Sequence, residues 1–381
     1  MNIVCFAHSE RLTGGANRSL LSVVEGLKEK GNQVTVVLPG RDAELERCYA
    51  QLDVPVVVMK YYKMASVLLH DRNPVIRYLK LFIKFAIDLF RSRRYAARIA
   101  ALCPDVCYTN TRLPYMGALV AKRLDIPHVW HMREYSIDNG SVGLPFENHI
   151  FDCLSEKVIC ISQDLLSEFN KGISSQKLVC IYNGIPNTIV PVMPKAHRGI
   201  NILLTGRIIQ AKDHMEALKA LKLLLKNYNE ITLYFAGSAL GEEGKRYEKD
   251  LNEYISKNRL SDYVVYLGEV KDMAGIRALM DIEIVCSKRE AFGRVTIEAM
   301  RCGLPVVGAN TGATPELIED GVSGLLYPKG DEQALADMIE RLALDEPYRL
   351  AMGKAAFAAV KNRFTVAQNV DEIWDILRSV V

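Results

Sequence analysis

Residues 282–300 read Ile-Glu-Ile-Val-Cys-Ser-Lys-Arg-Glu-Ala-Phe-Gly-Arg-Val-Thr-Ile-Glu-Ala-Met. The apolar run ends near Cys286, a loop carries Glu290, and Gly293 precedes residues with helical spacing. The stretch therefore predicts a buried strand, a turn and a helix that begins near Gly293. Because the first amides of a helix lack carbonyl partners and the helix dipole makes that end positive, we expect a phosphate or diphosphate to bind there.

Two carboxylates flank this expected anion seat. Glu298 lies five residues beyond Gly293, about 7.5 Å further along a helix that rises ~1.5 Å per residue. This arrangement suits a ligand with hydroxyls on both sides of a diphosphate, because carboxylates accept hydrogen bonds from paired hydroxyls. The alternative is that Glu290 is an ordinary loop charge and Glu298 a solvated helix charge, and the spacing alone does not decide between them.

The same alternation of strand, turn and helix continues in both directions along the chain. Segments with helical spacing separate short apolar or β-branched runs of strand length. These runs lie before residue 186 and after residue 199, at 3–7, 33–38, 54–59, 105–109, 128–131, 157–161, 177–181, 201–205, 231–236, 263–267, 282–286, 305–309 and 325–327. The pattern predicts an α/β protein built on two doubly wound parallel sheets.

A stretch without periodicity separates the two series of strands. Residues 186–199 contain three prolines and are typical of an interdomain linker. We expect an N-terminal domain over 1–187 and a C-terminal domain over 188–364, with a helix over 365–381 that packs back on the first domain. Because ligands bind beyond the carboxyl ends of strands in such sheets, we expect the chemistry in a cleft between the domains.

The composition excludes several classes of protein. The net charge is +3, with 24 Lys/Arg against 18 Asp/Glu in residues 1–195 and 24 against 27 in residues 196–381. This charge difference between the two halves is too small for a nucleic-acid-binding protein. It nevertheless suggests that the first half binds an anionic ligand or surface. The nine cysteines show no zinc-ligand spacing, which indicates free thiols in a reducing cytoplasm. No apolar run is long enough to span a membrane, and the first residues read as mature structure, not as a signal peptide.

Three motifs stand close together in the second half of the chain. They are Glu290 and Glu298 with seven residues between them, Ala-Met-Arg-Cys-Gly-Leu-Pro-Val-Val at 299–307, and Thr-Gly-Ala-Thr-Pro-Glu-Leu-Ile-Glu-Asp-Gly-Val-Ser-Gly-Leu-Leu at 311–326. Over about residues 200–364 the chain closely resembles the retaining glycosyltransferase family 4. Over residues 1–199 the resemblance rests on the architecture, a Gly-rich first loop and one histidine.

The resemblance implies both a fold and an activity. The fold is GT-B, in which two Rossmann-like domains face an interdomain cleft and the C-terminal domain holds most of the donor nucleotide. The activity is a hexosyl transfer with retention of configuration, from a UDP- or GDP-sugar to a glycan or lipid-linked acceptor. The implied enzyme uses no metal and no other cofactor, and the sequence carries no Asp-x-Asp motif suited to a divalent ion.

The resemblance also assigns roles to residues. It implies a catalytic role for His131, Arg207, Lys212 and Glu290. Glu290 would contact the transferred sugar, Glu298 the ribose hydroxyls, and backbone near Leu267 the base, while Arg207 and Lys212 would neutralise the diphosphate. The donor-binding set implied in this way is Gly14, Gly15, Arg207, Lys212, Leu267, Phe292, Gly293, Arg294, Val295 and Glu298.

Several of these positions have simpler interpretations. Gly14 and Gly15 are also compatible with an ordinary turn, and Asn17 stands where the family usually has an acidic residue. A lone histidine beside a strand, such as His131, is more often structural, and His128 on the same predicted strand is a rival candidate.

Residues 60–98 form a basic stretch, with ten Lys/Arg against two Asp/Glu. Arg77, Lys80 and Lys84 share one face of a predicted helix, and the other face carries Leu79, Phe82, Ile83 and Ala86. We favour a helix whose apolar face packs on the sheet. The alternative is a helix that lies on the anionic inner face of the membrane. In that case the acceptor is expected to be lipid-linked or a growing cell-envelope polysaccharide.

Two rival functions have less support in the sequence. A GT-B sugar-nucleotide epimerase generally lacks the Glu-x7-Glu region in this form, and a phosphorylase would need a cofactor-binding lysine site that no pattern indicates. A non-catalytic sugar-nucleotide-binding protein or scaffold would not need Glu290, Glu298, Arg207 and Lys212 together.

Overall fold

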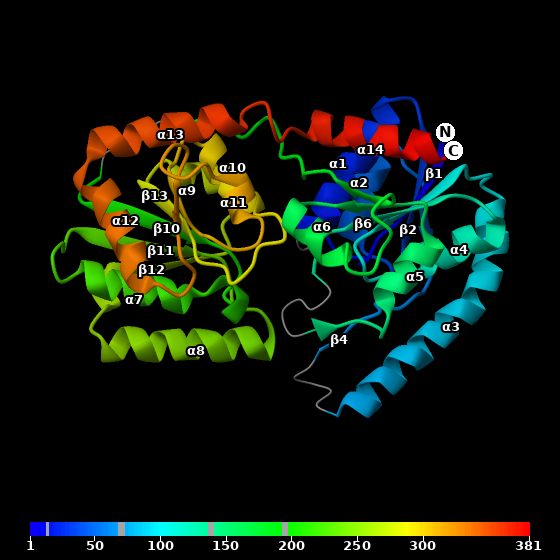
Figure 1. Ribbon diagram of the computed structural model, residues 1–381, viewed down its shortest axis with the longest axis horizontal. Helices are drawn as coiled ribbons and strands as arrows, with labels where there is room; N and C mark the ends of the chain where they lie inside the picture. Colours follow the sequence, from blue (N-terminus) through cyan, green and yellow to red (C-terminus); the bar gives the residue numbers. More distant parts are fainter. Residues whose placement is uncertain (13–14, 68–72, 136–140, 193–196) are drawn as a thin grey trace. The chain divides into compact units, whose positions relative to one another are not determined.

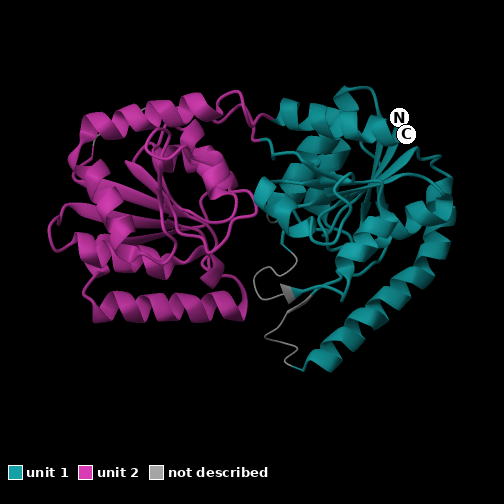
Figure 2. Cartoon of the chain, in the orientation of Figure 1, with its two compact units in different colours: residues 1–184, 366–381 teal, residues 185–365 magenta. Residues whose placement is uncertain are grey.

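The computed structural model describes residues 1–12, 15–67, 73–135, 141–192 and 197–381. The chain forms two compact units (Figure 2). Unit 1 comprises Met1–Gly184 and Val366–Val381, and unit 2 comprises Ile185–Thr365. Each unit has its own parallel sheet and its own hydrophobic core.

Unit 1 is built on a seven-stranded parallel sheet with the order β3-β2-β1-β5-β6-β8-β9. All seven strands expected in this part of the chain are present, with ends that differ by one or two residues. Their bounds are β1 Asn2–Phe6, β2 Gln33–Leu38, β3 Val56–Val58, β5 Val106–Asn110, β6 His128–Met132, β8 Lys157–Cys160 and β9 Leu178–Cys180. A two-stranded antiparallel ribbon, β4 Ser66–Val67 with β7 Ser141–Val142, was not predicted because each strand is only two residues long.

Helices cover both faces of this sheet. One buried cluster joins Leu20 and Val24 of α1 to Ile373 and Leu377 of α14, and a second lies around Val120 of α4. The helices of the unit are α1 Gly15–Glu29, α2 Ala43–Gln51, α3 Pro74–Ala100, α4 Met116–Leu124, α5 Glu147–Leu154, α6 Gln163–Phe169 and α14 Val366–Val380.

Unit 2 is built on a six-stranded parallel sheet with the order β12-β11-β10-β13-β14-β15. Its strands are β10 Ile200–Thr205, β11 Ile231–Ala236, β12 Val264–Gly268, β13 Ile282–Val285, β14 Val306–Ala309 and β15 Leu325–Tyr327, which confirms the six predicted runs. The helices are η1 Gln210–Lys212, α7 His214–Leu224, α8 Gly241–Lys257, η2 Ser261–Tyr263, α9 Met273–Arg277, α10 Arg294–Arg301, α11 Thr314–Leu317, α12 Glu332–Leu344 and α13 Glu346–Val360.

The strand order of both sheets reverses beside the first strand. In unit 1 the chain runs outward from β1 to β3 and then returns to place β5 on the other side of β1. In unit 2 it does the same from β10 to β12, and then places β13 beside β10. This arrangement confirms the doubly wound α/β fold, and it creates the switch points at which such sheets bind ligands.

The proline-rich stretch packs on unit 2 as far as it is described. The amide of Val192 donates to the carbonyl of Cys302 (3.1 Å), and the Arg301 guanidinium donates to the carbonyl of Ile189 (3.2 Å). Residues 185–192 therefore lie along the end of α10, and part of the predicted linker, 193–196, lies outside the described residues.

The favoured interpretation of the basic stretch is wrong. Helix α3 does not pack its predicted apolar face on the sheet, because these side chains are exposed: Leu79, Phe82, Ile83 and Ala86. The opposite side of the helix is buried and carries polar groups. The Asp88 carboxylate accepts from the amide of Tyr62 (2.8 Å), and the Arg123 guanidinium donates to the Ser92 hydroxyl (2.6 Å). These polar bonds, together with the buried side chains of Leu81, Ala96 and Ile99, hold α3 on unit 1 with its predicted apolar face outward.

The nine cysteines are free thiols, as expected from their spacing. Five of them are buried: Cys5, Cys107, Cys160, Cys286 and Cys302.

Helix α14 completes the core of unit 1 from the other end of the chain (Figure 1). A side chain on Gly26 of α1 would come within 2.7 Å of Val370, so the two helices approach closely at this glycine. The Asn369 amide group donates to the carbonyl of Tyr182 (2.6 Å), and the Lys30 ammonium lies 4.8 Å from the centre of the Trp374 ring.

We predict that Leu377→Ala lowers the free energy of unfolding of unit 1 by about 2–5 kcal/mol, because it opens a cavity at a fully buried position. Urea denaturation followed by circular dichroism measures this loss. Asp375→Ala, at an exposed position of the same helix, is the control and should change stability by less than about 0.5 kcal/mol. Equal effects of the two substitutions would show that α14 adds nothing to the core.

Candidate functional site

Two loops of unit 2 meet at its switch point. The first follows β10 and contains Gly206, Arg207 and the 3₁₀ turn that ends at Lys212. The second follows β13 and contains Ser287 and Glu290 before α10 begins. Because β10 and β13 are neighbouring parallel strands, their carboxyl ends bring the two loops to the same edge of the sheet.

Glu290 is the centre of the polar contacts at this edge. The Lys212 ammonium forms an ion pair with the Glu290 carboxylate, and the Ser287 hydroxyl donates to the same carboxylate oxygen (2.5 Å). The side chain of Glu290 is only 16% exposed. Glu290 is therefore not a solvated loop charge, and the sequence did not identify Ser287 as its partner.

Opposing effects act on the pKa of the Glu290 carboxyl. Burial alone would raise this pKa, but the charge of Lys212, the hydrogen bonds from Lys212 and Ser287, and the charge of Arg207 hold it below its ordinary value. The carboxylate is therefore ionised at neutral pH and can accept hydrogen bonds from hydroxyls.

Helix α10 begins where the sequence predicted. Gly293 precedes it in the left-handed conformation (φ 96°), and a side chain here would come within 3.2 Å of Leu317 and Thr296. Phe292 is buried against Phe364, with ring centres 5.9 Å apart, so it anchors the turn through its side chain.

A second glycine lies against the backbone of Glu290. Gly312 has φ 57°, and a side chain on it would lie 2.5 Å from the carbonyl oxygen of Glu290. The amide of Ala313 donates to that carbonyl (2.9 Å). The loop after β14 thus fixes the Glu290 backbone. Both residues belong to the sequence motif at 311–326, but the motif did not predict their contact with Glu290.

Glu298 lies one turn into α10, with two guanidinium groups nearby. Its carboxylate is 3.6 Å from Arg294 on the same helix and 3.8 Å from Arg277. Arg277 is buried and forms a second ion pair with the fully buried Glu283 (2.8 Å). Glu298 is therefore held by neighbouring cations, so the alternative interpretation of Glu298 as a solvated helix charge is wrong.

Other predicted donor-binding positions of unit 2 line the same strand ends. Arg207 is exposed directly after β10, and Leu267 is partly buried near the end of β12. Between them Gly237 follows β11 with φ 154°, and a side chain there would come within 1.9 Å of the carbonyl oxygen of Gly206. Val295 is partly buried in the first turn of α10.

In unit 1, His131 lies near the carboxyl end of β6 and is completely buried. Its Nδ1 is hydrogen-bonded to the Tyr108 hydroxyl and lies 3.4 Å from the Arg133 guanidinium, and its Nε2 has no hydrogen-bond partner among the described residues. Burial, with the charge of Arg133, lowers the pKa of His131 well below its ordinary value, so the ring is neutral.

The rival histidine lies at the other end of the same strand. His128 is bonded to the Thr109 hydroxyl (2.8 Å) and packs edge-on against Trp130. Burial lowers its pKa to about 3, although a backbone hydrogen bond at Leu154 opposes this shift. These contacts fit a structural histidine.

A polar cluster that the sequence did not predict surrounds His131. The Arg133 guanidinium donates to the side-chain oxygens of Asn110 (2.6 Å) and Asn183. Asn17 of α1 is also buried and donates to the carbonyls of Ser9 (3.0 Å) and Arg11 (2.6 Å), so it stabilises the loop after β1.

The predicted glycine pair of this loop is only partly described. Gly15 is the first residue of α1, and Gly14 lies outside the described residues. Within the described ranges, no group of three or more His, Cys, Asp or Glu side chains is placed to hold a metal ion.

Two family descriptions match consecutive parts of the chain. Glycosyltransferase Family 4 matches residues 13–188, and Glycosyl transferases group 1 matches residues 189–359. The chain belongs to glycosyltransferase family 4, a family of retaining enzymes with the GT-B fold. The fold and the glycosyltransferase class that the sequence predicted are thereby confirmed.

Curated relatives match only part of the chain. N-acetyl-alpha-D-glucosaminyl L-malate synthase of Bacillus anthracis is 27% identical over 59% of this chain and 61% of its own length. The capsular polysaccharide biosynthesis glycosyltransferase CapM of Staphylococcus aureus is 29% identical over 49% of this chain and 48% of its own. The matches thus span about half to three fifths of these relatives.

A solved structure matches along the whole chain. Anabaena HepE in complex with UDP is 24% identical, has a TM-score of 0.82 and is covered completely, as is this chain. The likeness shows the common fold.

We predict that Arg277→Met lowers the free energy of unfolding of unit 2 by about 3–5 kcal/mol, because it leaves Glu283 buried without its counter-ion. The double variant Arg277→Met, Glu283→Leu removes both charges and should recover most of the loss. Urea denaturation measures both variants. A single variant as stable as the parent protein would contradict the buried pair.

Proposed function

We propose that the protein moves a sugar from a nucleoside-diphosphate sugar, with UDP favoured over GDP, to a hydroxyl of a glycan or lipid-linked acceptor. The observation that carries this proposal is the Lys212–Glu290–Ser287 contact beside the start of α10, at the switch point of unit 2. It combines a cation, an ionised carboxylate and the amides of the first turn of α10 within one pair of loops.

Each group has a role in this proposal. The amides of Gly293, Arg294 and Val295 bind the diphosphate, and Phe292 fixes their turn. The ammonium of Lys212 has three donors, so it can bind a phosphate oxygen while it still holds Glu290.

The two ends of the donor meet different residues. Glu290 accepts from the sugar hydroxyls and Glu298 from the ribose hydroxyls, while backbone near Leu267 contacts the base. His131, with Gly14 and Gly15, borders the reacting sugar and the phosphates, as the family resemblance implies.

The reaction replaces the bond between the anomeric carbon and the diphosphate with a bond to the acceptor on the same face of the sugar, so the configuration is retained. The acceptor oxygen forms a bond to this carbon while the bond to the leaving diphosphate breaks, and the acceptor proton passes to a diphosphate oxygen. Negative charge grows on the diphosphate, and Arg207 and Lys212 stabilise it without the need for a metal.

The relatives support a UDP-sugar donor and an envelope acceptor. HepE has been solved with UDP and with UDP-glucose, and CapM acts in capsular polysaccharide biosynthesis. We therefore propose a UDP-hexose as donor and a cell-envelope polysaccharide or glycolipid as product, made on the cytoplasmic side of the membrane.

We expect Arg207→Ala and Lys212→Ala each to lower kcat about 100- to 1000-fold at saturating donor, because each removes a cation that stabilises the leaving diphosphate. Release of nucleoside diphosphate from a panel of UDP- and GDP-sugars measures turnover, and the preferred donor should raise Tm. Lys219→Ala removes an exposed cation of α7 and is the control. Near-normal rates in the first two variants would exclude them from the mechanism.

We also propose that α3 docks unit 1 on an anionic lipid surface. Seven large apolar side chains of this helix are exposed: Val75, Ile76, Leu79, Phe82, Ile83, Leu89 and Phe90. At 3.6 residues per turn they fall within a sector of about 140°, and residues 75–90 extend about 22 Å along the helix. A continuous apolar strip of this size on a soluble surface marks an interaction site.

The charges beside the strip favour a membrane. Helix α3 carries seven Lys/Arg and one acidic residue, Asp88, which is buried. Lys80, Arg93, Arg94 and Arg98 are exposed. A second copy of this helix would bring like charges together, whereas an anionic bilayer accepts both the cations and the apolar side chains. No helix in the described ranges is long and apolar enough to cross a bilayer.

The protein should sediment with vesicles that contain phosphatidylglycerol, more strongly at low salt, and not with pure phosphatidylcholine vesicles. Phe82→Ser combined with Phe90→Ser should abolish this binding. Phe146→Ser changes an isolated aromatic side chain that is 85% exposed, and it serves as the matched control. A dimer in light scattering without vesicle binding would instead assign the strip to a second copy.

A further inference from the structure

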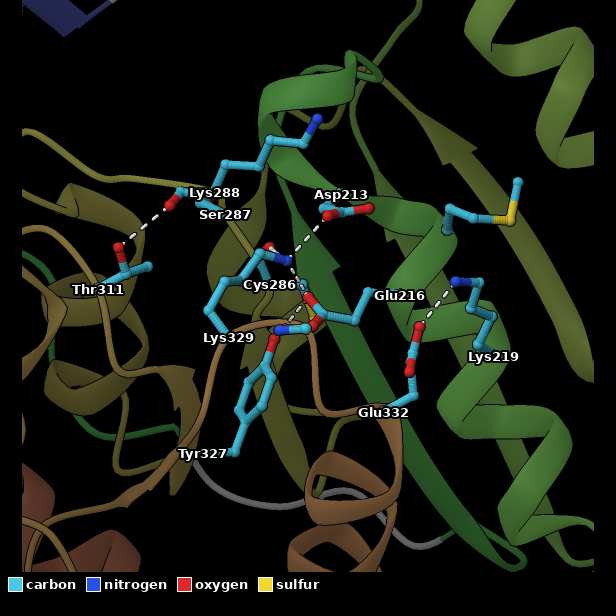
Figure 3. A network of polar contacts seen from close by, with 12 residues as sticks. Asp213, Glu216, Lys219, Cys286, Ser287, Lys288, Thr311, Tyr327, Lys329 and Glu332 are labelled. Atoms are coloured by element: carbon cyan, nitrogen blue, oxygen red, sulfur yellow. Dashed lines mark hydrogen bonds and ion pairs between the residues drawn. The ribbon is translucent and has the colours of Figure 1, made fainter.

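A cluster of partly buried charges joins the two loops of the proposed donor site (Figure 3). Its centre is Lys329, which follows β15. The Lys329 ammonium lies 2.8 Å from the Asp213 carboxylate, forms an ion pair with Glu216 and donates to the carbonyl of Cys286 (3.0 Å). One side chain thus contacts two segments of unit 2, the start of α7 and the end of β13.

Two of these contacts are direct neighbours of the donor site along the chain. Asp213 immediately follows Lys212 and has the left-handed conformation (φ 50°) at the end of its turn. Cys286 immediately precedes Ser287, which donates to Glu290. Lys329 therefore connects the end of the Lys212 turn with the beginning of the Glu290 loop.

Glu216 holds Lys329 in this place. It is 3% exposed, and it also accepts from the Tyr327 hydroxyl (2.9 Å) and the amide of Gly330 (2.7 Å), so both of its oxygens are occupied. Burial alone would lower the pKa of Lys329, but hydrogen bonds and ion pairs with Asp213 and Glu216 raise it above its ordinary value. The ammonium is therefore charged at working pH.

We propose that Lys329 is a positioning residue that sets the distance between Lys212 and Glu290. It acts through Asp213 and through the carbonyl of Cys286, and it needs no contact with the donor. The amide of Lys288 donates to the carbonyl of Ala211 (2.9 Å) and is a second tie between the same loops. The inference rests on the proposed function, because it takes Lys212 and Glu290 as parts of the donor site.

Loss of the ammonium should disturb the site without removing any donor-binding group. In Lys329→Met, the Cys286 carbonyl and the Asp213 carboxylate lose their shared partner, and the two loops keep the backbone bond at Lys288 and the Lys212–Glu290 ion pair itself. A displacement on the order of 1 Å at a catalytic group can cost about 100-fold in rate. Lys329→Arg keeps the charge and should restore part of the rate.

A double-mutant cycle tests this role. Donor turnover is measured at saturating UDP-sugar for Lys212→Ala, Lys329→Met and the double variant. We expect Lys329→Met to lower kcat about 10- to 100-fold in the parent protein. In the Lys212→Ala background it should lower kcat by less than about 3-fold, because the distance that Lys329 is proposed to set, between the Lys212 ammonium and Glu290, no longer exists there. Fully multiplicative losses would overturn the inference.

Further variants keep the test decisive. If Lys329→Met does not fold, Asp213→Gly replaces it, since glycine keeps the left-handed turn and removes only the carboxylate. Lys219→Met breaks an exposed pair between α7 and Glu332 of α12 and should leave kcat unchanged. A normal rate for Lys212→Ala would refute the proposed donor site itself, which separates that failure from a failure of the positioning role.

Discussion

The parallel pairing of β10 with β13 is the constraint on which the proposed donor site depends. These strands are far apart in the chain, and only the reversal of strand order at β10 makes them neighbours. Their pairing places Lys212 and Glu290 at one edge, and the ion pair between them then holds a carboxylate ionised in a largely buried position. The glycines at 293 and 312 and the cluster at Lys329 all adjust backbone around this pair.

Much of this architecture could be predicted because buried parallel strands leave a strong signal. They are short apolar runs between turns, and all thirteen strands of the two main sheets were found in this way. The same reasoning could not predict which face of α3 is exposed. Helical spacing separates an apolar face from a polar one, but only tertiary contacts decide which face is buried. Here Asp88 and Ser92 form inner contacts beside the buried Leu81 and Ile99.

The candidate site shows the same division between local and distant information. The sequence located Glu290, Gly293 and Glu298 because they belong to one strand–turn–helix unit. It did not locate Arg277, Gly312 or Lys329, because each contacts this unit from a separate element. In unit 1, His131 was found by resemblance, whereas its partners Tyr108 and Arg133 became visible only through the pairing and ends of β5 and β6.

The return of α14 to unit 1 also affects the order in which the protein can fold during translation. Ile373 and Leu377 pack in the same core cluster as the buried side of α1, yet the ribosome synthesises them after the whole of unit 2. The later unit can therefore complete its core first, while Leu20 and Val24 of the earlier unit still await their partners. This apolar surface of α1 therefore stays uncovered while about half of the protein is synthesised. During that period α1 is a defined segment that a chaperone could protect.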